Sequence, residues 1–223
     1  MVTRPSILII GAGGHARSAL NLLQRHGGYT PIGFVDSVNG PGTRVYGLEV
    51  LGAEEDLSCI CQHYSLNHLL VAVGDNFSRE VITSRIRKKL PNINFPNLVD
   101  PSAVVSSDAK LESGVLVFAQ AHVGAGCTLG QGSIVNTRSS LDHDCSLDAY
   151  ASLAPGAITG GHVHIGARSF IGLGALVIQK VRIGNDTVVG AGSLVLRDFP
   201  DCIVSYGSPA KIVRTRLPYE SYF

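Results

Sequence analysis

Tryptophan is missing from this 223-residue sequence, methionine occurs once, and charged residues make up only 16% of it. Acidic and basic residues nearly balance, with a formal net charge of +1, so the charge does not favour nucleic acid or an anionic membrane surface as a partner. No apolar run approaches the roughly 18 residues that a membrane-spanning helix needs. The apolar stretch Ile7–Ile10 is too short for a secretory signal peptide. We therefore expect a cytoplasmic protein that binds neither nucleic acid nor membrane.

Cysteine pairs of the kind that make disulfide frameworks or zinc ribbons are also lacking. The sequence has five cysteines, an odd number, and the closest two, Cys59 and Cys61, are spaced Cys-x-Cys rather than Cys-x-x-Cys. Neither the number nor the spacing fits a complete disulfide set or a structural zinc site. We expect reduced thiols and no bound metal.

Short apolar runs alternate with helical patterns in residues 1–96. The predicted strands and helices, in order along the chain, are Ile7–Ile10, His15–His26, Ile32–Asp36, Ala53–His63, Leu69–Val73 and Ser78–Leu90. Strands that alternate with helices are typical of a small parallel sheet, so we predict an α/β, Rossmann-like βαβ domain over residues 1–96.

The apolar pattern changes to a period of six in residues 97–223. Sixteen of the seventeen positions taken in steps of six from Val99 to Val195 are Val, Ile or Leu, and the exception is Thr159. Four residues after each of these positions stands a smaller side chain, such as Ala121 or Cys127. A period of six fits neither a helix nor an ordinary strand, but it fits short strands joined by tight corners in a stacked solenoid.

This repeat resembles the left-handed parallel β-helix of the hexapeptide-repeat acyltransferases, in which three hexapeptides form one triangular coil. The resemblance implies that residues eighteen apart stack at the strand spacing of about 4.8 Å. Cys127 and Cys145 would then stack in the inward position. We expect them to be inert core residues, and a thiol nucleophile is the alternative.

A glycine-rich turn follows the first predicted strand and opens the first helix. Its residues are Gly11-Ala12-Gly13-Gly14-His15-Ala16, and Asp36 ends the second strand. Exposed backbone N–H groups at the start of a helix form a site for phosphate, and an acid after the second strand can bind a ribose. A purely structural tight turn and a nicotinamide dinucleotide site are the alternatives.

The turn, Gly33-Phe34-Val35-Asp36 and Ala72-Val73-Gly74-Asp75 together resemble the N-terminal domain of a family of bacterial sugar acetyltransferases. The family comprises the PglD/NeuD-like nucleotide-sugar 4-amino N-acetyltransferases and sialic-acid O-acetyltransferases, which join such a domain to a left-handed β-helix. The resemblance covers nearly the whole chain. It implies that the sugar nucleotide is bound by Gly13, Gly14, His15, Asp36, Gly74 and, in the β-helix, Asn136.

The resemblance also assigns the catalytic base to His143 within Asp142-His143-Asp144. Asp144 would orient the imidazole and raise its basicity through a charge-assisted hydrogen bond. His162 lies eighteen residues beyond Asp144, so stacking makes it the rival base or a second partner of Asp144. We expect His122 and His164 to be solvated. A zinc-dependent carbonic anhydrase is disfavoured, because its H-x-x-x-x-H pair is missing from the hexapeptide-repeat region, residues 97–223.

Acetyl-CoA is the co-substrate that the resemblance implies. The family places the pantetheine arm in the groove between neighbouring β-helices, which implies a homotrimer. The tail Gly207-Ser208-Pro209-Ala210-Lys211 resembles the Gly-x-Pro-Ala-Lys segment at the far end of the coenzyme, where Lys211 and Arg214 would meet phosphates. The other positions assigned to the coenzyme are Gly161, Leu173, Ala191 and Ser152, which stands where relatives often carry a second histidine.

The sequence therefore predicts an acetyl-CoA-dependent N-acetyltransferase for the 4-amino group of a UDP-, GDP- or dTDP-linked 4-amino-4,6-dideoxy sugar in bacterial surface glycan biosynthesis. Attack is direct, with His143 as the base. An O-acetyltransferase for a sugar such as sialic acid is one alternative. A non-catalytic trimer that binds sugar nucleotides is another.

Overall fold

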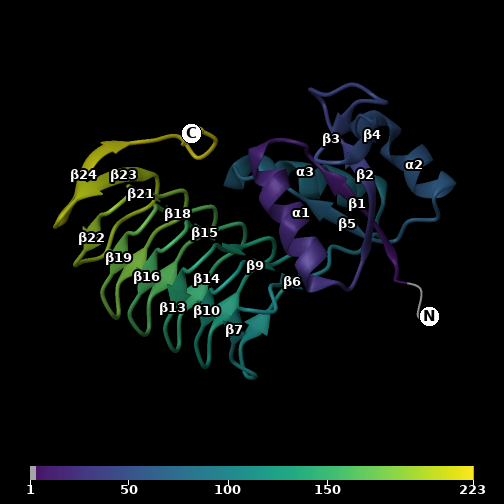
Figure 1. Ribbon diagram of the computed structural model, residues 1–223. Helices are drawn as coiled ribbons and strands as arrows, with labels where there is room; N and C mark the ends of the chain where they lie inside the picture. Colours follow the sequence, from purple (N-terminus) through teal and green to yellow (C-terminus); the bar gives the residue numbers. More distant parts are fainter. Residues whose placement is uncertain (1–3, 223) are drawn as a thin grey trace. The chain divides into compact units, whose positions relative to one another are not determined.

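A computed structural model describes residues 4–222, which divide into two compact units. The first unit comprises residues up to Gly74 and Ser78–Leu98, and the second comprises Asp75–Phe77 and the chain from Val99 onward. In Figure 1 the first unit is drawn in purple and blue, and the second in teal through yellow.

The first unit is built on a five-stranded sheet in the order β3-β4-β2-β1-β5. β1 pairs in parallel with β2 and β5, β2 pairs in parallel with β4, and β3 and β4 form an antiparallel hairpin. Its strands and helices are β1 (Ser6–Ile10), α1 (Gly14–His26), β2 (Thr30–Val35), β3 (Arg44–Val45), β4 (Leu48–Gly52), η1 (Glu54–Asp56), α2 (Leu57–His63), β5 (Leu69–Val71) and α3 (Asn76–Lys89). The Rossmann-like prediction is confirmed, and the sequence analysis missed the β3–β4 hairpin.

The second unit is a left-handed parallel β-helix whose three faces are sheets of two-residue strands, seen as the ladder of arrows in Figure 1. The first sheet contains β7 (Val104–Val105), β10 (His122–Val123), β13 (Ser140–Leu141), β16 (Ile158–Thr159), β19 (Leu176–Val177) and β22 (Leu194–Val195). The second contains β8 (Lys110–Leu111), β11 (Thr128–Leu129), β14 (Ser146–Leu147), β17 (His164–Ile165) and β20 (Arg182–Ile183). The third contains β6 (Leu98–Val99), β9 (Leu116–Val117), β12 (Ile134–Val135), β15 (Ser152–Leu153), β18 (Phe170–Ile171), β21 (Val188–Val189), β23 (Ile203–Gly207) and β24 (Ala210–Thr215).

The hexapeptide period sets the register of these sheets. Strands pair with those eighteen residues away, as His122 does with Ser140 and Ser146 does with His164. The aliphatic side chain of each strand points inward, and Leu141 and Ile165 are fully buried. The predicted fold class and the predicted stacking are both confirmed.

From Gly114 to Gly192, each corner of the coil contains a residue in the left-handed backbone region, three positions after the inward aliphatic. Glycine occupies this position at Gly126 and Gly174, but Asp144 (φ 56°) and His162 (φ 58°) occupy it elsewhere. Left-handed backbone costs a non-glycine residue roughly 1 kcal/mol, with Asp and His among the residues that adopt it most often. The corners therefore hold polar side chains in a fixed outward position.

The tail after the last coil extends the third sheet. β23 pairs in parallel with β21, and β24 then returns antiparallel to β23. Among residues 4–222, no helix combines the length and the apolar character that crossing a membrane would require.

Candidate active site

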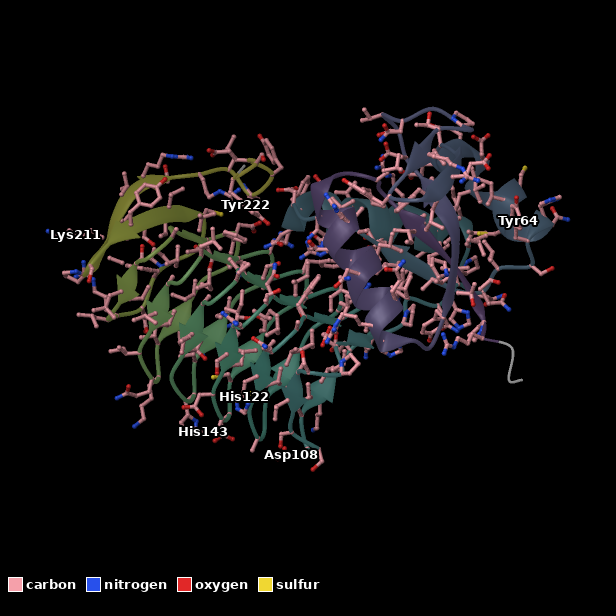
Figure 2. The ribbon with its side chains drawn as sticks, viewed as in Figure 1. Tyr64, Asp108, His122, His143, Lys211 and Tyr222 are labelled. Atoms are coloured by element: carbon pink, nitrogen blue, oxygen red, sulfur yellow. The ribbon has the colours of Figure 1, made fainter. Side chains whose placement is uncertain are left out.

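His143 lies at the corner between β13 and β14, where its side chain projects from the coil (Figure 2). Its Nδ1 is 2.9 Å from Asp144 Oδ2, and both side chains are 53% exposed. The backbone N–H of His143 also donates to Asp142 Oδ1. The hydrogen bond with Asp144 raises the pKa of His143 above its ordinary value, against the opposing effect of desolvation, and the nearby Asp142 charge adds to the rise. The predicted His–Asp pair is therefore formed, and it involves Nδ1 of the ring and not Nε2.

His162 joins this pair from the next coil. Its Nε2 lies 3.7 Å from Asp144 Oδ2, and its ring meets that of His143 edge to face with 5.1 Å between centroids. The backbone N–H of His162 donates to the His143 carbonyl at 2.9 Å, which fixes the two corners against each other. The predicted column of Asp144 and His162 is thus observed.

Gly161 forms the surface on which the His143 ring rests. A Cβ atom at residue 161 would lie 2.5 Å from His143 Nε2 and 2.6 Å from Cε1, far inside van der Waals contact. Glycine leaves room here for the close approach of the imidazole, and its φ is not left-handed. Gly161, assigned to the coenzyme from the sequence, therefore influences where the His143 ring can lie.

Two other predictions about this β-helix had different outcomes. His164 was expected to be solvated, and this is wrong, because its Nδ1 lies 2.6 Å from Ser146 Oγ and its Nε2 lies 3.4 Å from Asp148. The cause is the stacking of His164 on Ser146, eighteen residues earlier.

Cys127 and Cys145 are buried in the inward position as predicted, and the hydrogen bond with Cys145 together with burial raises the pKa of Cys127.

The glycine turn of the first unit leaves its backbone open. Gly13 is the N-cap of α1, Gly14 is its first residue, and a Cβ at either position would meet no atom within 4 Å. Packing inside the chain therefore does not require glycine at these positions. Small residues with free space above a helix N-terminus allow a phosphate to approach the backbone N–H groups closely.

Asp36 and Gly74 lie beside this turn. The carboxylate of Asp36 accepts hydrogen bonds from the N–H groups of Ala12, Val38 and Asn39. Burial opposes the shift, but these bonds lower the pKa of Asp36 below its ordinary value. Asp36 thus ties the turn to the loop that follows β2, and Gly74 lies against the side chain of His15.

The sequence analysis missed two side chains near the turn. Tyr46 donates its hydroxyl to the Gly13 carbonyl at 3.3 Å, and the Arg17 guanidinium lies over the Tyr46 ring at 5.6 Å. Tyr46 is in the β3–β4 hairpin, more than thirty residues from the turn, so only strand pairing brings it there. The signal available in the sequence was Gly47 alone, because glycine readily takes the positive φ that a two-residue hairpin turn needs.

His15 is half-buried, and desolvation, followed by the Arg79 charge, lowers its pKa from 6.5 to about 4. The His15 imidazole binds a proton more tightly in the unfolded chain than in the folded chain. The contribution of neutral His15 to the free energy of unfolding is therefore complete above pH 6.5 and is lost as the pH falls toward 4. We expect a loss of up to about 3 kcal/mol, since one pKa unit corresponds to about 1.4 kcal/mol. Urea unfolding of the parent and of His15→Asn, each at pH 7 and pH 5, measures how much of the pH-dependent loss in the free energy of unfolding comes from His15. Equal pH dependence in the two proteins would show that His15 contributes nothing.

Comparison with known proteins places this chain among sugar acetyltransferases. Residues 6–86 match the family model of the PglD N-terminal domain. PerB from Caulobacter crescentus, in complex with CoA and GDP-perosamine, is 38% identical, with a TM-score of 0.86 over 95% of this chain and 98% of that chain. The acetyltransferase domain of PglB from Neisseria gonorrhoeae, in complex with acetyl coenzyme A, is 36% identical, with a TM-score of 0.88 over 95% and 100%. GDP-perosamine N-acetyltransferase of Escherichia coli O157:H7 is 28% identical over 82% of each chain.

The chain belongs to the PglD/NeuD-like family of hexapeptide-repeat acyltransferases. The family predicted from the sequence is confirmed, and this member is an acetyltransferase with acetyl-CoA as its co-substrate.

Two of the coenzyme positions expected from the family line one hollow of the β-helix. Leu173 and Ala191 belong to a cavity of about 420 Å³ between the third sheet and the tail, together with Tyr206, Arg214 and Arg216. Leu173 is 57% exposed, so its side chain is accessible from this hollow. Arg214 also pairs with Glu220 at 2.6 Å, and this bond raises its pKa further above its ordinary value.

The remaining expected positions lie apart from this hollow within the chain. Ser152 is buried, and its hydroxyl donates to Asn76 Oδ1 at 2.7 Å. Lys211 is exposed near the start of β24. Asn136 lies at the next corner of the coil from His143, with β13 between them, and its Oδ1 accepts the Thr137 N–H.

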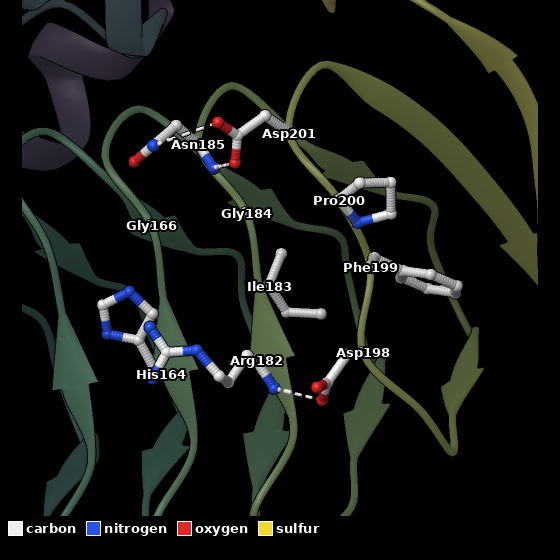
Figure 3. A pocket seen from close by; sticks show the side chains of 10 residues that line it. All are labelled: His164, Gly166, Arg182, Ile183, Gly184, Asn185, Asp198, Phe199, Pro200 and Asp201. Carbon is white, nitrogen blue, oxygen red and sulfur yellow. Dashed lines mark hydrogen bonds between the residues drawn. The ribbon is translucent and has the colours of Figure 1, made fainter.

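A second hollow, of about 480 Å³, lies over the second sheet (Figure 3). His164, Arg182 and Asp198 line one end of it, and Asn185 and Asp201 line the other. Asp198 and Asp201 accept the backbone N–H groups of Arg182 and Asn185, so these carboxylates close the last coil. The hollow contains none of the residues that the sequence assigned to the site.

Replacing Gly161 with alanine is expected to lower kcat about 10- to 100-fold, because the added methyl displaces the His143 ring by roughly 1 Å. The methyl meets the end of a flexible side chain, so the free energy of unfolding should stay within about 0.5 kcal/mol of the parent. Steady-state kinetics measures the change in kcat, and urea unfolding measures the change in the free energy of unfolding. Full activity in Gly161→Ala would show that the position of the ring is not critical.

Proposed function

We propose that this enzyme transfers the acetyl group of acetyl-CoA to the 4-amino group of a UDP-, GDP- or dTDP-linked 4-amino-4,6-dideoxy sugar, in bacterial surface glycan biosynthesis. The observation that carries the proposal is the His143–Asp144 pair, which is exposed at a β-helix corner with Nε2 of His143 free of the carboxylate. The open glycine turn supports a nucleotide-linked acceptor, because its backbone N–H groups suit a diphosphate. Two of the relatives point to such an acceptor: one is named a GDP-perosamine N-acetyltransferase, and PerB is bound to GDP-perosamine.

Direct transfer needs one base and one oxyanion donor. The 4-amino nitrogen attacks the thioester carbonyl carbon while His143 Nε2 removes a proton from the amine, and Asp144 stabilises the imidazolium through Nδ1. A backbone N–H near the base, such as that of Gly161, would stabilise the oxyanion. When the C–S bond breaks, the coenzyme thiolate takes up the proton, so the products are the amide and free CoA.

A homotrimer is part of this proposal. Outward positions of the first sheet are apolar in the later coils, where Ile158 and Leu176 are each 45% exposed and Leu196 is 49% exposed. The column Val104, His122, Ser140, Ile158, Leu176 and Leu194 contains no acidic or strongly basic side chain. Exposed apolar area of this kind is typical of an interface between chains. A neighbouring chain on this face would bring a second corner close to His143, so that the donor groove forms between chains.

The test is release of free CoA from acetyl-CoA with UDP-, GDP- and dTDP-linked 4-amino-4,6-dideoxy sugars as acceptors. One of the three should support turnover, with mass spectrometry showing an added acetyl group on nitrogen. The same sugars with a 4-hydroxyl group, and free sialic acid, are the matched acceptors for O-acetylation. Turnover only with the hydroxyl acceptors would overturn N-acetylation, and tight nucleotide binding without any turnover would favour a binding protein.

A further inference from the structure

Three potential metal ligands converge at the corner that carries the base. One ligand atom from each of His143, Asp144 and His162 lies within 4.8 Å of the others, and no further group of three His, Cys, Asp or Glu meets this condition within residues 4–222. Asp144 Oδ2 is at the centre, 2.9 Å from His143 Nδ1 and 3.7 Å from His162 Nε2.

We propose that His143, Asp144 and His162 form a binding site for a divalent transition metal ion such as Zn²⁺, and that the bound ion inhibits acetyl transfer. The proposal of metal binding rests only on the positions of these three side chains. Inhibition rests on the proposed function, in which His143 is the base.

The donor set and the distances suit zinc. Two imidazoles and one carboxylate are the ligands of many zinc sites that keep a position open for water. Metal–ligand bonds of about 2.0–2.2 Å in a tetrahedron place the ligand atoms about 3.3 Å apart, between the two distances observed here. All three side chains are exposed, so small rotations about their side-chain bonds bring them to that separation.

The backbone presents these ligands from a rigid frame. Asp144 and His162 occupy the same left-handed corner position on consecutive coils, with φ values of 56° and 58°. The hydrogen bond from His162 N to His143 O joins the two corners directly. Stacked coils therefore fix the spacing of the ligands without any contribution from a loop.

Occupation of the site removes the base. An ion bound to His143 Nδ1 takes the place of the proton that Nδ1 shares with Asp144, and a neutral imidazole bound in this way carries its proton on Nε2. Nε2 then has no lone pair with which to accept a proton from the amine. An ion bound to Nε2 occupies that lone pair directly. Either arrangement stops proton removal.

The test measures metal binding and activity separately on the full chain, in a Cys59→Ser background because the exposed Cys59 thiol also binds zinc. Isothermal titration should give one Zn²⁺ per chain, and Co²⁺ should give the visible absorption of a low-coordinate site. His162→Asn should weaken Zn²⁺ binding at least about tenfold. His63→Asn, which removes an exposed histidine of α2, is the matched control and should leave the affinity unchanged.

Acetyl transfer by the parent should fall as the site fills and return when EDTA is added. Equal Zn²⁺ affinity in the parent, His162→Asn and His143→Asn would overturn the site, and one bound ion without inhibition would overturn its effect on the base. Zinc binding that depends on these residues, in a protein that acetylates none of the acceptors, would contradict the proposed function and leave the metal site standing.

Discussion

Replacing His143 with asparagine is expected to lower kcat by roughly 100- to 10,000-fold, the range that a general base contributes. Asparagine keeps a polar side chain of similar reach at an exposed corner, so the fold should be unaffected. The nucleotide is proposed to bind at the glycine turn of the other unit, so its affinity should stay within about twofold of the parent. Steady-state kinetics with saturating acetyl-CoA gives kcat, and calorimetric titration with the nucleotide gives its affinity.

His63→Asn is the control for this experiment, because His63 is an exposed histidine of α2, outside the proposed site and the proposed interface. If His143→Asn keeps its turnover while His162→Asn loses it, the base is His162, which shares Asp144 with His143. A loss of nucleotide affinity equal to the loss of kcat would instead indicate that His143 acts in binding and not in proton transfer.

Replacing Leu176 with arginine is expected to convert a trimer into monomers and to lower kcat/KM for acetyl-CoA at least about a hundredfold. A charge placed in an apolar interface without a partner costs several kcal/mol, and about 2.7 kcal/mol corresponds to a hundredfold in association. The donor groove is proposed to lie between chains, so activity should disappear together with assembly. Light scattering coupled to size-exclusion chromatography, at the concentration used in the assay, measures the mass.

Thr128→Arg is the matched change for Leu176→Arg, because it places the same charge on an exposed position of the second sheet. It should leave both mass and activity unchanged. A monomeric parent, or a Leu176→Arg variant that stays trimeric and active, would show that the first sheet does not form the interface.

The six-residue period made the β-helix predictable with its register. One inward aliphatic every six residues can be buried only by coils of fixed length. Coils of fixed length stack residues that are eighteen apart, so the period predicts that Asp144 and His162 lie in one column. The Rossmann-like unit was predictable because β1, β2 and β5 are short apolar runs flanked by turn residues. Helix α3 begins two residues earlier than predicted, at Asn76, which is within the usual uncertainty of a helix end.

The parts that the sequence did not reveal depend on contacts between distant residues. Tyr46 reaches Gly13 only because the β3–β4 hairpin joins the sheet beside β2, and neither strand has a clear apolar alternation. His164 contacts Ser146 and Asp148, which lie on the neighbouring coil. The residues next to His164 in the sequence do not indicate these contacts.

By itself the sequence determined the two-part architecture, the column in which His143, Asp144 and His162 meet, and the open glycine turn, because each follows from local repetition or from one short segment. Only the tertiary structure decided where the imidazole of His143 rests, since Gly161 makes room for it from the next coil. It likewise decided that Asp36 binds the backbone of the glycine turn and that Arg214 and Arg216 share a hollow with Leu173. Atom positions of this kind depend on which chain segments pack against each other, and a sequence pattern records only which side of a strand or corner a residue occupies.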